Sequence, residues 1–472
     1  MQFFFWRDST MMGVNGDKQH QFVFFNLEDY VPKGHLLRAI QREVDFSFIY
    51  DKVKHLYSSV GRKSIDPVLL MKMMLIGYLY GIPSERRLEE EVSLNLAYRW
   101  FLGLDLTDSV PDHSTLSQNR RRRFKDSSIF QDIFDHIVAK CIEMGIVTGE
   151  VIVTDSTHVK ASASLSHSEK VKVDKKPSEY LQELEKEAQR LERQRQAERE
   201  AEGKKKCGPV KQDRPDAVNQ TEVTQSQTDP GAGLMNRPKK PVGFHYLGHT
   251  SIDTAHGIIT DIYVTPGNVN DHEPYGGRLA IQQEKFGLDI KKACADKGYD
   301  CAVVHHVLEK QNIEGYISPV MKESSIEAIG DKPFQYDEQS DKYLCPEGKT
   351  LKFTSVEGDG IKEPYRRVYA AKTKDCKACS LREQCFGKSK NYRVIRRALF
   401  HEATERNKER AKTDEYRNLM RLRSIWCEGT FGIMKQSHNL SRTHKRGIRN
   451  ATEHCLFSAL SLNIKRMIKA IA

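Results

Sequence analysis

The chain has 472 residues, of which 75 are Lys or Arg and 64 are Asp or Glu, giving a formal net charge of +11 and a pI near 9.0. This length is too great for a single ordinary core and predicts two to four folded units. The basic balance favours a polyanionic partner over an acidic small molecule, although many surface lysines on an ordinary soluble protein would give the same balance.

The N-terminal segment carries a run of aromatic residues, Phe3, Phe4, Phe5 and Trp6. The run is too short for a secretory signal and lacks a basic leader, and no apolar stretch elsewhere reaches membrane-spanning length. We therefore expect a cytoplasmic protein without a membrane partner. In such a chain the ten cysteines are expected to be metal ligands and reduced core thiols, not a disulfide framework.

Residues 18–145 have the pattern of a helical unit. Asp66 directly precedes Pro67, which is the order of an N-cap and a first-turn proline. Further along, a capped start runs into four consecutive arginines, beginning with Arg120 and Arg121. A series of short helices, the last of which is basic, predicts a helical DNA-binding domain that contacts DNA through these arginines. A solvated arginine cluster at a helix end is the other interpretation.

Residues 148–320 alternate strand and helix signals. Three strands with tight connections, followed by helix, strand, helix and strand, predict an α/β unit: a mixed sheet flanked by helices, with a site at its strand ends. The expected strands are residues 150–154, 244–253, 257–264, 290–295 and 314–318. Residues 397–472 are helical and end in an apolar stripe suited to packing on this sheet.

Two insertions interrupt the α/β unit. The first, residues 161–240, is almost uniformly polar. Its 177–206 stretch predicts a solvated helix with ion pairs between successive turns, and 207–241 has the composition of a flexible linker. We therefore expect a partner arm or tether outside the core; a coiled coil is the alternative, with a sparse apolar seam. The second insertion spans residues 325–395.

The second insertion holds the cysteines Cys345, Cys376, Cys379 and Cys385. A CxxC pair with two outlying cysteines is typical of a closed tetrahedral zinc site. Four sulfur ligands would leave no open position, so such a Zn²⁺ would stabilise the insertion and take no part in catalysis. Reduced thiols that fill a small module are the alternative.

Three acidic residues fit a single divalent-metal site. Asp155 and Asp296 each follow a short apolar run, whereas Glu428 lies on a predicted helix with Lys435 on the same face two turns later. Together they can hold two Mg²⁺ or Mn²⁺ ions, the chemistry of phosphodiester cleavage and transfer. Taken singly, each acid could be only a turn, cap or ion-pair residue. Asp300 competes with Asp296 but lies farther from the apolar run.

At these residues the chain resembles the DDE transposases of bacterial insertion sequences, which have a ribonuclease H-like core. The passages that carry the resemblance are residues 153–157, 295–299, Glu428 with Lys435, the turn 265–271, and 114–116. The resemblance implies a core split between 148–320 and 397–472, preceded by the all-α domain. It further implies metal-dependent cleavage at the ends of an insertion sequence and strand transfer into target DNA. Asp155, Asp296 and Glu428 would be the metal ligands, and Lys435 would contact DNA near the cut.

One departure from the family pattern concerns the basic contact before the glutamate. Many relatives have Tyr seven and Arg four residues before it, whereas this chain has Arg421 and Ser424 there. Helical geometry puts Arg421 on the face of Glu428 and Lys435, so Arg421 is one candidate for the basic contact and Arg423 is the other.

The segment after Lys435 is basic and includes Arg442, Lys445 and Arg446. We expect it to meet the DNA backbone beside the cut, a solvated loop being the alternative. The expected partner is double-stranded DNA, at the element ends and the target, bound by a homodimer in a bacterial cytoplasm and associated with the nucleoid when bound. A DNA-binding protein that no longer cuts, and a metal-dependent nuclease without strand transfer, are the other function classes.

Overall fold

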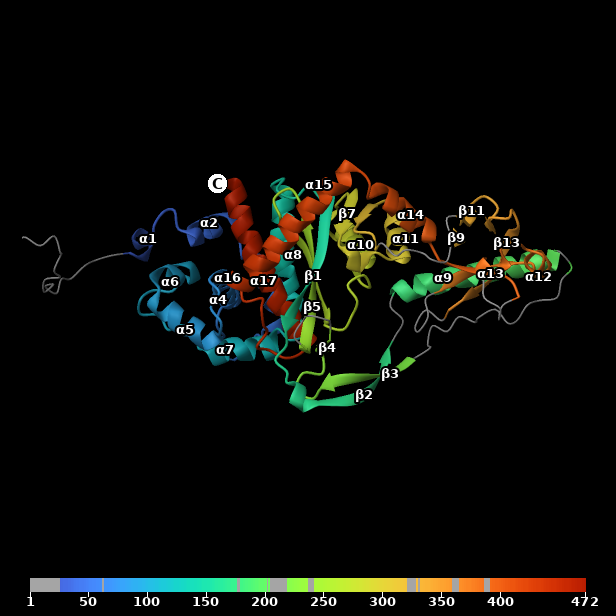
Figure 1. Ribbon diagram of the computed structural model, residues 1–472. Coiled ribbons are helices and arrows are strands. Elements are labelled where there is room, and N and C mark those ends of the chain that lie inside the picture. The colour runs from blue at the N-terminus through green and yellow to red at the C-terminus, as the bar shows by residue number, and fades with distance from the viewer. Residues whose placement is uncertain are drawn as a thin grey trace, which may run out of the picture.

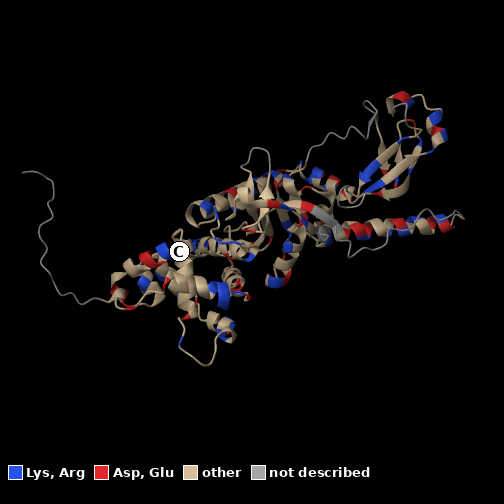
Figure 2. Ribbon diagram, turned by 90° about the horizontal axis from the view of Figure 1, so that it is seen from below, with Lys and Arg blue, Asp and Glu red and all other residues tan. Residues whose placement is uncertain are grey.

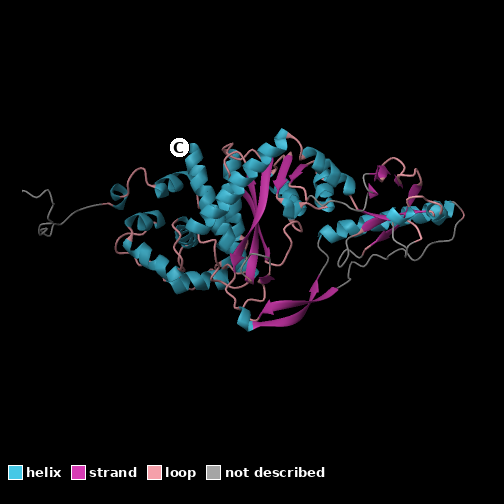
Figure 3. Cartoon of the chain, viewed as in Figure 1, coloured by secondary structure: helices cyan, strands magenta, loops and turns pink. Residues whose placement is uncertain are grey.

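The computed structural model describes residues 26–61, 63–175, 179–201, 203, 219–236, 242–320, 328–329, 332–358, 365–385 and 391–472. A helical region, a central sheet with its helices, and an outlying module with a long helix follow one another across the molecule (Figure 1, Figure 3). The expectations for residues 18–25 and for 207–218 and 237–241 of the linker lie outside the described residues, whereas 219–236 contain two strands and are no flexible linker. Within the described residues, no helix combines the length and apolarity needed to cross a bilayer.

Helices form the described chain from Leu27 to Glu143. They are α1 (Leu27–Tyr30), α2 (Leu36–Glu43), α3 (Phe48–Val53), α4 (Pro67–Leu79), α5 (Glu85–Leu94), α6 (Leu96–Leu102), α7 (His113–Gln118) and α8 (Ile129–Glu143), with a 3-10 turn at Lys54–Leu56 and a π turn at Asn119–Arg123. Asp66 caps α4 as predicted, because its Oδ1 accepts from the Val68 amide at 2.7 Å. The side chains of α4 are apolar on nearly every face, which places this helix inside the core that the helical region shares with the sheet.

The central sheet has six strands: β1 (Val151–Lys160), β4 (Gly233–Met235), β5 (Gly243–Asp253), β6 (Ile259–Pro266), β7 (Lys292–Ala295) and β8 (Glu314–Ile317). β5 runs antiparallel to β1, β4 and β6, whereas β7 pairs with both β1 and β8 in parallel. The crossovers to the parallel strands are α10 (Tyr275–Phe286) and α11 (Ala302–Lys310), and a 3-10 turn follows β7 at Lys297–Tyr299. The prediction of a mixed α/β sheet is confirmed.

β1 is longer than predicted. Its parallel pairing with β7 ends at Val153↔Cys294, but its antiparallel pairing with β5 continues to Lys160↔His245. The expectation that Asp155 follows a strand is therefore wrong: Asp155 lies within β1, just beyond its last paired residue on the β7 side. The strand continues through polar residues because the β5 backbone supplies their hydrogen-bond partners.

The C-terminal segment returns to the sheet as α14 (His401–Arg410), α15 (Asp414–Arg423), α16 (Gly429–Ser437) and α17 (Ile448–Ile471). A π-helical turn, Ser424–Glu428, joins α15 to α16. α15 packs on β1, β7 and β8, whereas α17 packs on β5 and β6 and also on α4 and α8 (Figure 1). The predicted apolar stripe is thus the surface that joins the helical region to the sheet.

The first insertion forms a hairpin, β2 (Ser168–Lys175) with β3 (Asn219–Ser226), after a 3-10 turn at Leu165–His167, and the long helix α9 (Glu179–Ala201). α9 carries charges of both signs along its length (Figure 2). Leu184, Ala188 and Leu191 are nevertheless buried against Val303 and Leu399, so α9 is no solvated arm. Their spacing places them on one face, which is sufficient to pack on another surface although it is too sparse for a coiled coil.

The second insertion folds as an antiparallel sheet of β11 (Gln335–Asp337), β12 (Lys342–Leu344), β13 (Thr350–Glu357), β14 (Arg366–Ala371) and β15 (Val394–Ala398). The short helices α12 (Thr373–Lys377) and α13 (Arg382–Cys385) connect β14 to β15, and a small pair, β9 (Ala328–Ile329) and β10 (Lys332–Pro333), precedes the sheet. A separate core that includes Tyr343, Tyr369 and Ile395 makes it a module of its own, against which α9 packs through β13.

Candidate metal and nucleic-acid site

Asp155 and Asp296 lie side by side because of strand register. β1 and β7 are parallel, with Val151 paired to Lys292 and Val153 to Cys294. The same offset places Asp155 level with Asp296, which is the first residue after β7. Residues at the same level of parallel neighbours project toward the same face of the sheet. Two carboxylates separated by 140 residues of sequence therefore meet without any loop having to bring them together.

Arg423, at the end of α15, reaches between these two carboxylates. Its Nη2 lies 2.7 Å from Asp155 Oδ2 and 4.0 Å from Asp296 Oδ2. Burial raises the pKa of Asp155 to about 6; Arg423 and the Ser156 amide lower it, and the negative charges of Asp296 and Asp271 raise it further. One guanidinium is thus shared by more than one acid, and the site has an excess of negative charge.

Asp271 is an additional acid at this site. It lies in the loop after β6, and its Oδ1 accepts a hydrogen bond of 2.6 Å from the Ser156 hydroxyl, next to Asp155. A Cβ atom built on Gly298 would lie 3.0 Å from Asp296 Oδ1 and 3.5 Å from Asp271 Oδ2, so the two carboxylates border the same small space. In the sequence, this loop is recognisable only through the resemblance of the turn 265–271, and no residue pattern indicates a role for Asp271.

Glu428 lies at the edge of the same site. Its side chain is exposed, and its Oε1 accepts a 3.0 Å hydrogen bond from the Ser424 hydroxyl. Its neighbour Cys427 is buried toward the aspartates: burial raises the pKa of this thiol to a value above its usual range, and the charge of Asp155 adds to the shift. The turn that carries Glu428 thus packs on β1, whereas the Glu428 carboxylate itself lies at the solvent side.

The π turn Ser424–Glu428 changes which of the two candidate cations, Arg421 or Arg423, lies on the side of Glu428. In an α-helix, residues five apart are about 140° apart around the axis, whereas a π turn closes bonds between residues i and i+5 and so brings them onto one side. Arg423 and Glu428 are five apart and span the turn Ser424–Glu428. Of the two candidate cations, Arg423 contacts the aspartates, whereas Arg421 is exposed.

Trp426 fixes the helix that carries Glu428. Gly257, at φ +73°, lies under its ring, and a Cβ there would be only 2.2 Å from a ring carbon. The Arg466 guanidinium stacks 5.3 Å from the centre of the Trp426 ring and donates to Thr430 Oγ1 at 2.8 Å. The turn between β5 and β6 and the helix α17 therefore hold the π turn from both sides.

The tightest group of potential metal ligands in the described part of the chain is elsewhere, at Glu89, Asp112 and His113, whose ligand atoms lie within 4.8 Å of one another. Hydrogen bonds within the protein account for it: Asp112 caps α7 through the Ser114 amide at 2.6 Å, and Glu89 Oε2 pairs with the amide and ring of His113 at 2.8 Å each. The three predicted ligands do not reach that spacing; only the aspartates share a contact, through Arg423.

Arg120, expected to contact DNA, is enclosed within the protein. It is 5% exposed and pairs with Glu85 and with Glu453, whose Oε1 lies 3.2 Å from its Nη1. Lys445 Nζ lies 3.1 Å from the same Glu453 oxygen. The prediction for Arg120 does not fit this structure, because a guanidinium buried between carboxylates cannot reach a phosphate. Lys445 is partly covered by the same cluster.

The other predicted basic contacts remain at the surface. Arg121, Arg421, Lys435, Arg442 and Arg446 are all exposed. Lys435 and Arg442 line a cavity of about 690 Å³ between the segment that follows α16 and the helices α4, α5 and α7. Leu88, Ile82 and Glu85 also line it. The cavity therefore has basic, acidic and apolar side chains in its lining.

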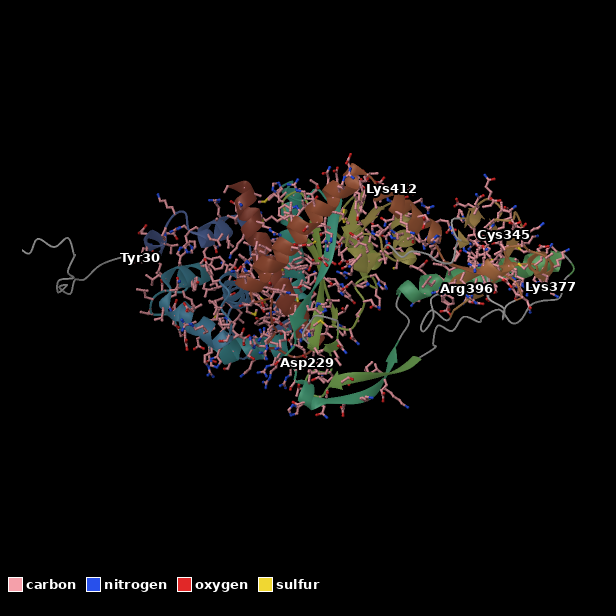
Figure 4. All side chains as sticks on the ribbon, in the orientation of Figure 1. Tyr30, Asp229, Cys345, Lys377, Arg396 and Lys412 are labelled. Atoms are coloured by element: carbon pink, nitrogen blue, oxygen red, sulfur yellow. The ribbon has the colours of Figure 1, made fainter. Side chains whose placement is uncertain are left out.

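The four cysteines of the second insertion lie in its module (Figure 4 labels Cys345), and Cys345, Cys376 and Cys385 pack against its core. All four are free and half-buried. Burial raises the pKa of the Cys385 thiol, Arg393 lowers it, and the other three cysteines raise it again, so those three lie within electrostatic range of Cys385. The Lys349 amide donates to Cys345 Sγ at 3.3 Å. In the described structure, no three of the four sulfurs lie within 4.8 Å of one another.

Two family profiles match the chain. Residues 25–122 match the Transposase domain (DUF772), and residues 344–468 match the Transposase DDE domain. The second match contains Glu428, Lys435 and the four cysteines, whereas Asp155 and Asp296 lie outside both. No curated protein sequence matches the chain.

Among solved structures, the chain is similar to a piggyBac transposase synaptic complex with hairpin DNA, at 9% identity and a TM-score of 0.33, covering 92% of this chain and 79% of that one. It is also similar to a Mos1 transposase paired-end complex, at 10% identity and a TM-score of 0.17, covering 58% and 65%. Both scores are too low to establish a common fold.

Proposed function

Because this chain belongs to the DDE transposases, we propose that it cuts DNA at the ends of an insertion sequence and joins the freed 3′ hydroxyls to target DNA. The observation that carries the proposal is the pairing of Asp155 and Asp296 at one level of two parallel strands around Arg423. The strand arrangement, three antiparallel strands followed by two parallel ones, supports a ribonuclease H-like core.

The residues present suit divalent ions. Asp155 and Asp296 supply carboxylate oxygens, the ligand type that Mg²⁺ and Mn²⁺ prefer, and a single guanidinium does not balance their charge together with that of Asp271. We assign Asp155, Asp296 and Glu428 as the residues that hold two such ions. Bound there, the ions would activate a water or 3′ hydroxyl and stabilise charge on the leaving oxygen.

Chain residues around the site have separate roles. Arg423 offsets the repulsion between the aspartates when no metal is bound. The anchored π turn carries Glu428 to the rim, where DNA would arrive, and Lys435 follows two turns later on the same face. Phosphate contacts by Lys435 and Arg442, which line the cavity, and by the exposed Arg446 would hold a DNA strand beside α16. The exposed Arg121 and Arg421 are further candidate DNA contacts.

The test is a supercoiled plasmid that carries the element ends, incubated with Mg²⁺ and the full chain. We expect cutting at the ends and insertion of the freed ends for the natural protein, and neither for Asp155→Ala. Asp289→Ala removes an exposed carboxylate near the same sheet and is the matched control, expected to behave as the natural protein. Cutting without insertion would establish the nuclease alternative, and DNA binding without any cutting would establish the inactive binder.

We further propose that Cys345, Cys376, Cys379 and Cys385 hold a structural Zn²⁺. The CxxC spacing with two outlying cysteines and the packing of Cys345, Cys376 and Cys385 against one small core support this assignment. Metal analysis of the dialysed protein is expected to give one zinc per chain, lost in Cys376→Ser. The natural zinc content in Cys376→Ser would contradict the assignment; Cys301→Ser, a half-buried cysteine outside the module, is the control.

A dimer on DNA follows from the proposed reaction, because two element ends must be held together. Light scattering on the complex with end DNA is expected to give two chains per pair of ends. A monomer with one end and full insertion activity would refute this expectation.

A further inference from the structure

We infer that Asp271 is a third carboxylate of the floor of this site and holds a divalent ion together with Asp155 and Asp296 before DNA binds. The inference rests on the proposed function, and it adds a residue that the acidic triad does not contain. Asp271 binds the ion in the free protein, whereas Glu428 completes the metal site only when DNA is present.

Ser156 ties Asp271 to the first aspartate. Its amide donates to Asp155 Oδ1 at 2.7 Å and its hydroxyl donates to Asp271 Oδ1 at 2.6 Å. One residue of β1 therefore fixes two carboxylates, one from its own strand and one from the loop after β6. A fixed carboxylate loses little further freedom on binding a metal, and this pre-organisation favours binding.

Gly298 ties Asp271 to the second aspartate. Its amide donates to Asp296 Oδ1 at 2.8 Å, and the space above its Cα is bordered by Asp296 Oδ1 and Asp271 Oδ2, at 3.0 and 3.5 Å from a built Cβ. Any side chain at this position would fill the space between the two carboxylates. The absence of a side chain leaves that space open to an ion or its water.

A buried hydroxyl points to the same place. Tyr299 is 1% exposed, and its hydroxyl has no hydrogen-bond partner among the described residues. An unpaired buried hydroxyl is costly, so a water or ion ligand is expected beside it. Burial raises the pKa of Tyr299 well above its usual value, and the next contributions come from the charges of Asp271, Asp155 and Asp296. The three carboxylates therefore lie within electrostatic range of this unpaired hydroxyl.

Glu428 differs from Asp271 in position. Its carboxylate is exposed and bonded to Ser424 on its own helix, whereas Asp271 is bonded to β1. Three carboxylates with Arg423 as the nearest cation leave the floor of the site negatively charged, which a divalent ion would neutralise. The helix can then bring Glu428 in as the last ligand, since its side chain is held by a single hydroxyl contact in the described structure.

The test measures Mn²⁺ binding to the full chain without DNA, by electron paramagnetic resonance of the free ion. We expect Asp271→Asn to weaken binding at least tenfold and Glu428→Gln to weaken it less than threefold. Glu273→Gln removes a carboxylate from the same loop, where it pairs with Asn270, and is expected to stay within twofold. Asp271→Asn with natural affinity would overturn the inference, and so would equal losses in Asp271→Asn and Glu273→Gln.

A second variant covers the case in which Asp271→Asn fails to fold, as judged by circular dichroism. Ser156→Ala keeps the Asp271 carboxylate but removes the hydroxyl that holds it. We expect this variant to bind Mn²⁺ about threefold more weakly; natural Mn²⁺ affinity would then overturn the inference. Asp155→Asn separates the two proposals. If it leaves Mn²⁺ binding unchanged, the proposed metal site itself fails, whereas a loss in Asp155→Asn without one in Asp271→Asn rejects only the role of Asp271.

Discussion

Two clusters of charged side chains among the described residues differ in their balance of charge. Between the helical region and α17, Glu85 and Glu453 pair with Arg120 and Lys445. At the end of β7, Asp155 and Asp296 share Arg423, and the charge of Asp271 also acts on Asp155. The first cluster is matched in charge and mostly buried, whereas the second has an excess of acids.

This difference separates structural charges from functional ones. A buried ion pair is satisfied inside the protein, and removing one member leaves the other uncompensated. An excess of buried acid is unfavourable unless a cation from outside completes it, and sites of that kind concentrate where function requires them. The balance of charge therefore supports the acidic cluster as the proposed metal site, whereas the cluster of Arg120, Glu85, Glu453 and Lys445 is a joint between two parts of the fold.

The largest expected effect comes from Asp296→Asn in the acidic cluster. Losing one carboxylate that holds the ions is expected to lower the cutting rate about a thousandfold, equivalent to about 4 kcal/mol. The free energy of unfolding in metal-free buffer should change by less than about 1 kcal/mol, since repulsion among the acids falls while the Asn Oδ1 can still accept from the Gly298 amide. Plasmid nicking and urea unfolding measure the two quantities; a large loss of stability would show that the cluster is structural.

The joint should respond in the opposite way. Arg120→Met leaves Glu453 buried without its guanidinium and is expected to lower the free energy of unfolding by about 3 kcal/mol. Arg121→Met, at the adjacent exposed position, should change it by less than about 0.5 kcal/mol. Urea unfolding measures both. Equal stability of the two variants would contradict the structural role of the joint, and salt-dependent DNA binding that falls only in Arg121→Met would support a surface contact there.

The sequence allowed the acidic site to be predicted because its signals are local. Asp155 and Asp296 each follow an apolar run, and the parallel register that brings them level is a property of neighbouring strands. The length of β1 was not predictable in this way, because it depends on pairing with β5, some 90 residues later. Glu428 was identified by its helix, but the π turn that aligns it with Arg423 leaves no pattern in the residue types.

The basic residues were harder to assign because the same residue type serves two purposes. Arg120 and Arg121 are indistinguishable in the sequence, yet Arg120 meets Glu453, 333 positions later, and its neighbour is exposed. Likewise, the apolar positions Leu184, Ala188 and Leu191 on α9 are too few to predict packing, because the surface that they meet is distant in the sequence. Asp271 is a loop residue whose role depends on a contact to β1. In each case, a partner distant in sequence decides the outcome.

The π turn Ser424–Glu428 beside the acidic cluster is held by packing of Trp426, not by ion pairs. The variant Gly257→Ala tests this packing. A methyl group there would meet the Trp426 ring at a backbone φ of +73°. Gly103→Ala is the matched control, because its φ is +72° and nothing lies within 4 Å. Both variants carry the cost of a left-handed backbone, and we expect Gly257→Ala to lose about 2 kcal/mol more in urea unfolding. Equal losses would show that Trp426 yields easily and does not fix the π turn.

The smallest effect concerns the pH response of the joint. Burial raises the pKa of Glu453 to about 7 from an ordinary 4.5, with Arg120 opposing the shift and Glu85 adding to it. Because the folded-state pKa is raised, its stabilising contribution is complete below about pH 4.5 and is lost as the pH rises through about 7. The side chain in Glu453→Gln stays neutral. Between pH 5 and 8 the free energy of unfolding of this variant should therefore fall less than that of the natural protein, by about 1 kcal/mol, which thermal unfolding at both pH values measures. Glu90→Gln, an exposed acid of the same region, should keep the natural slope. If the stability of Glu453→Gln depended on pH as that of the natural protein does, Glu453 would be charged throughout this range. The ion pair with Arg120 would then outweigh the effect of burial on the pKa of Glu453.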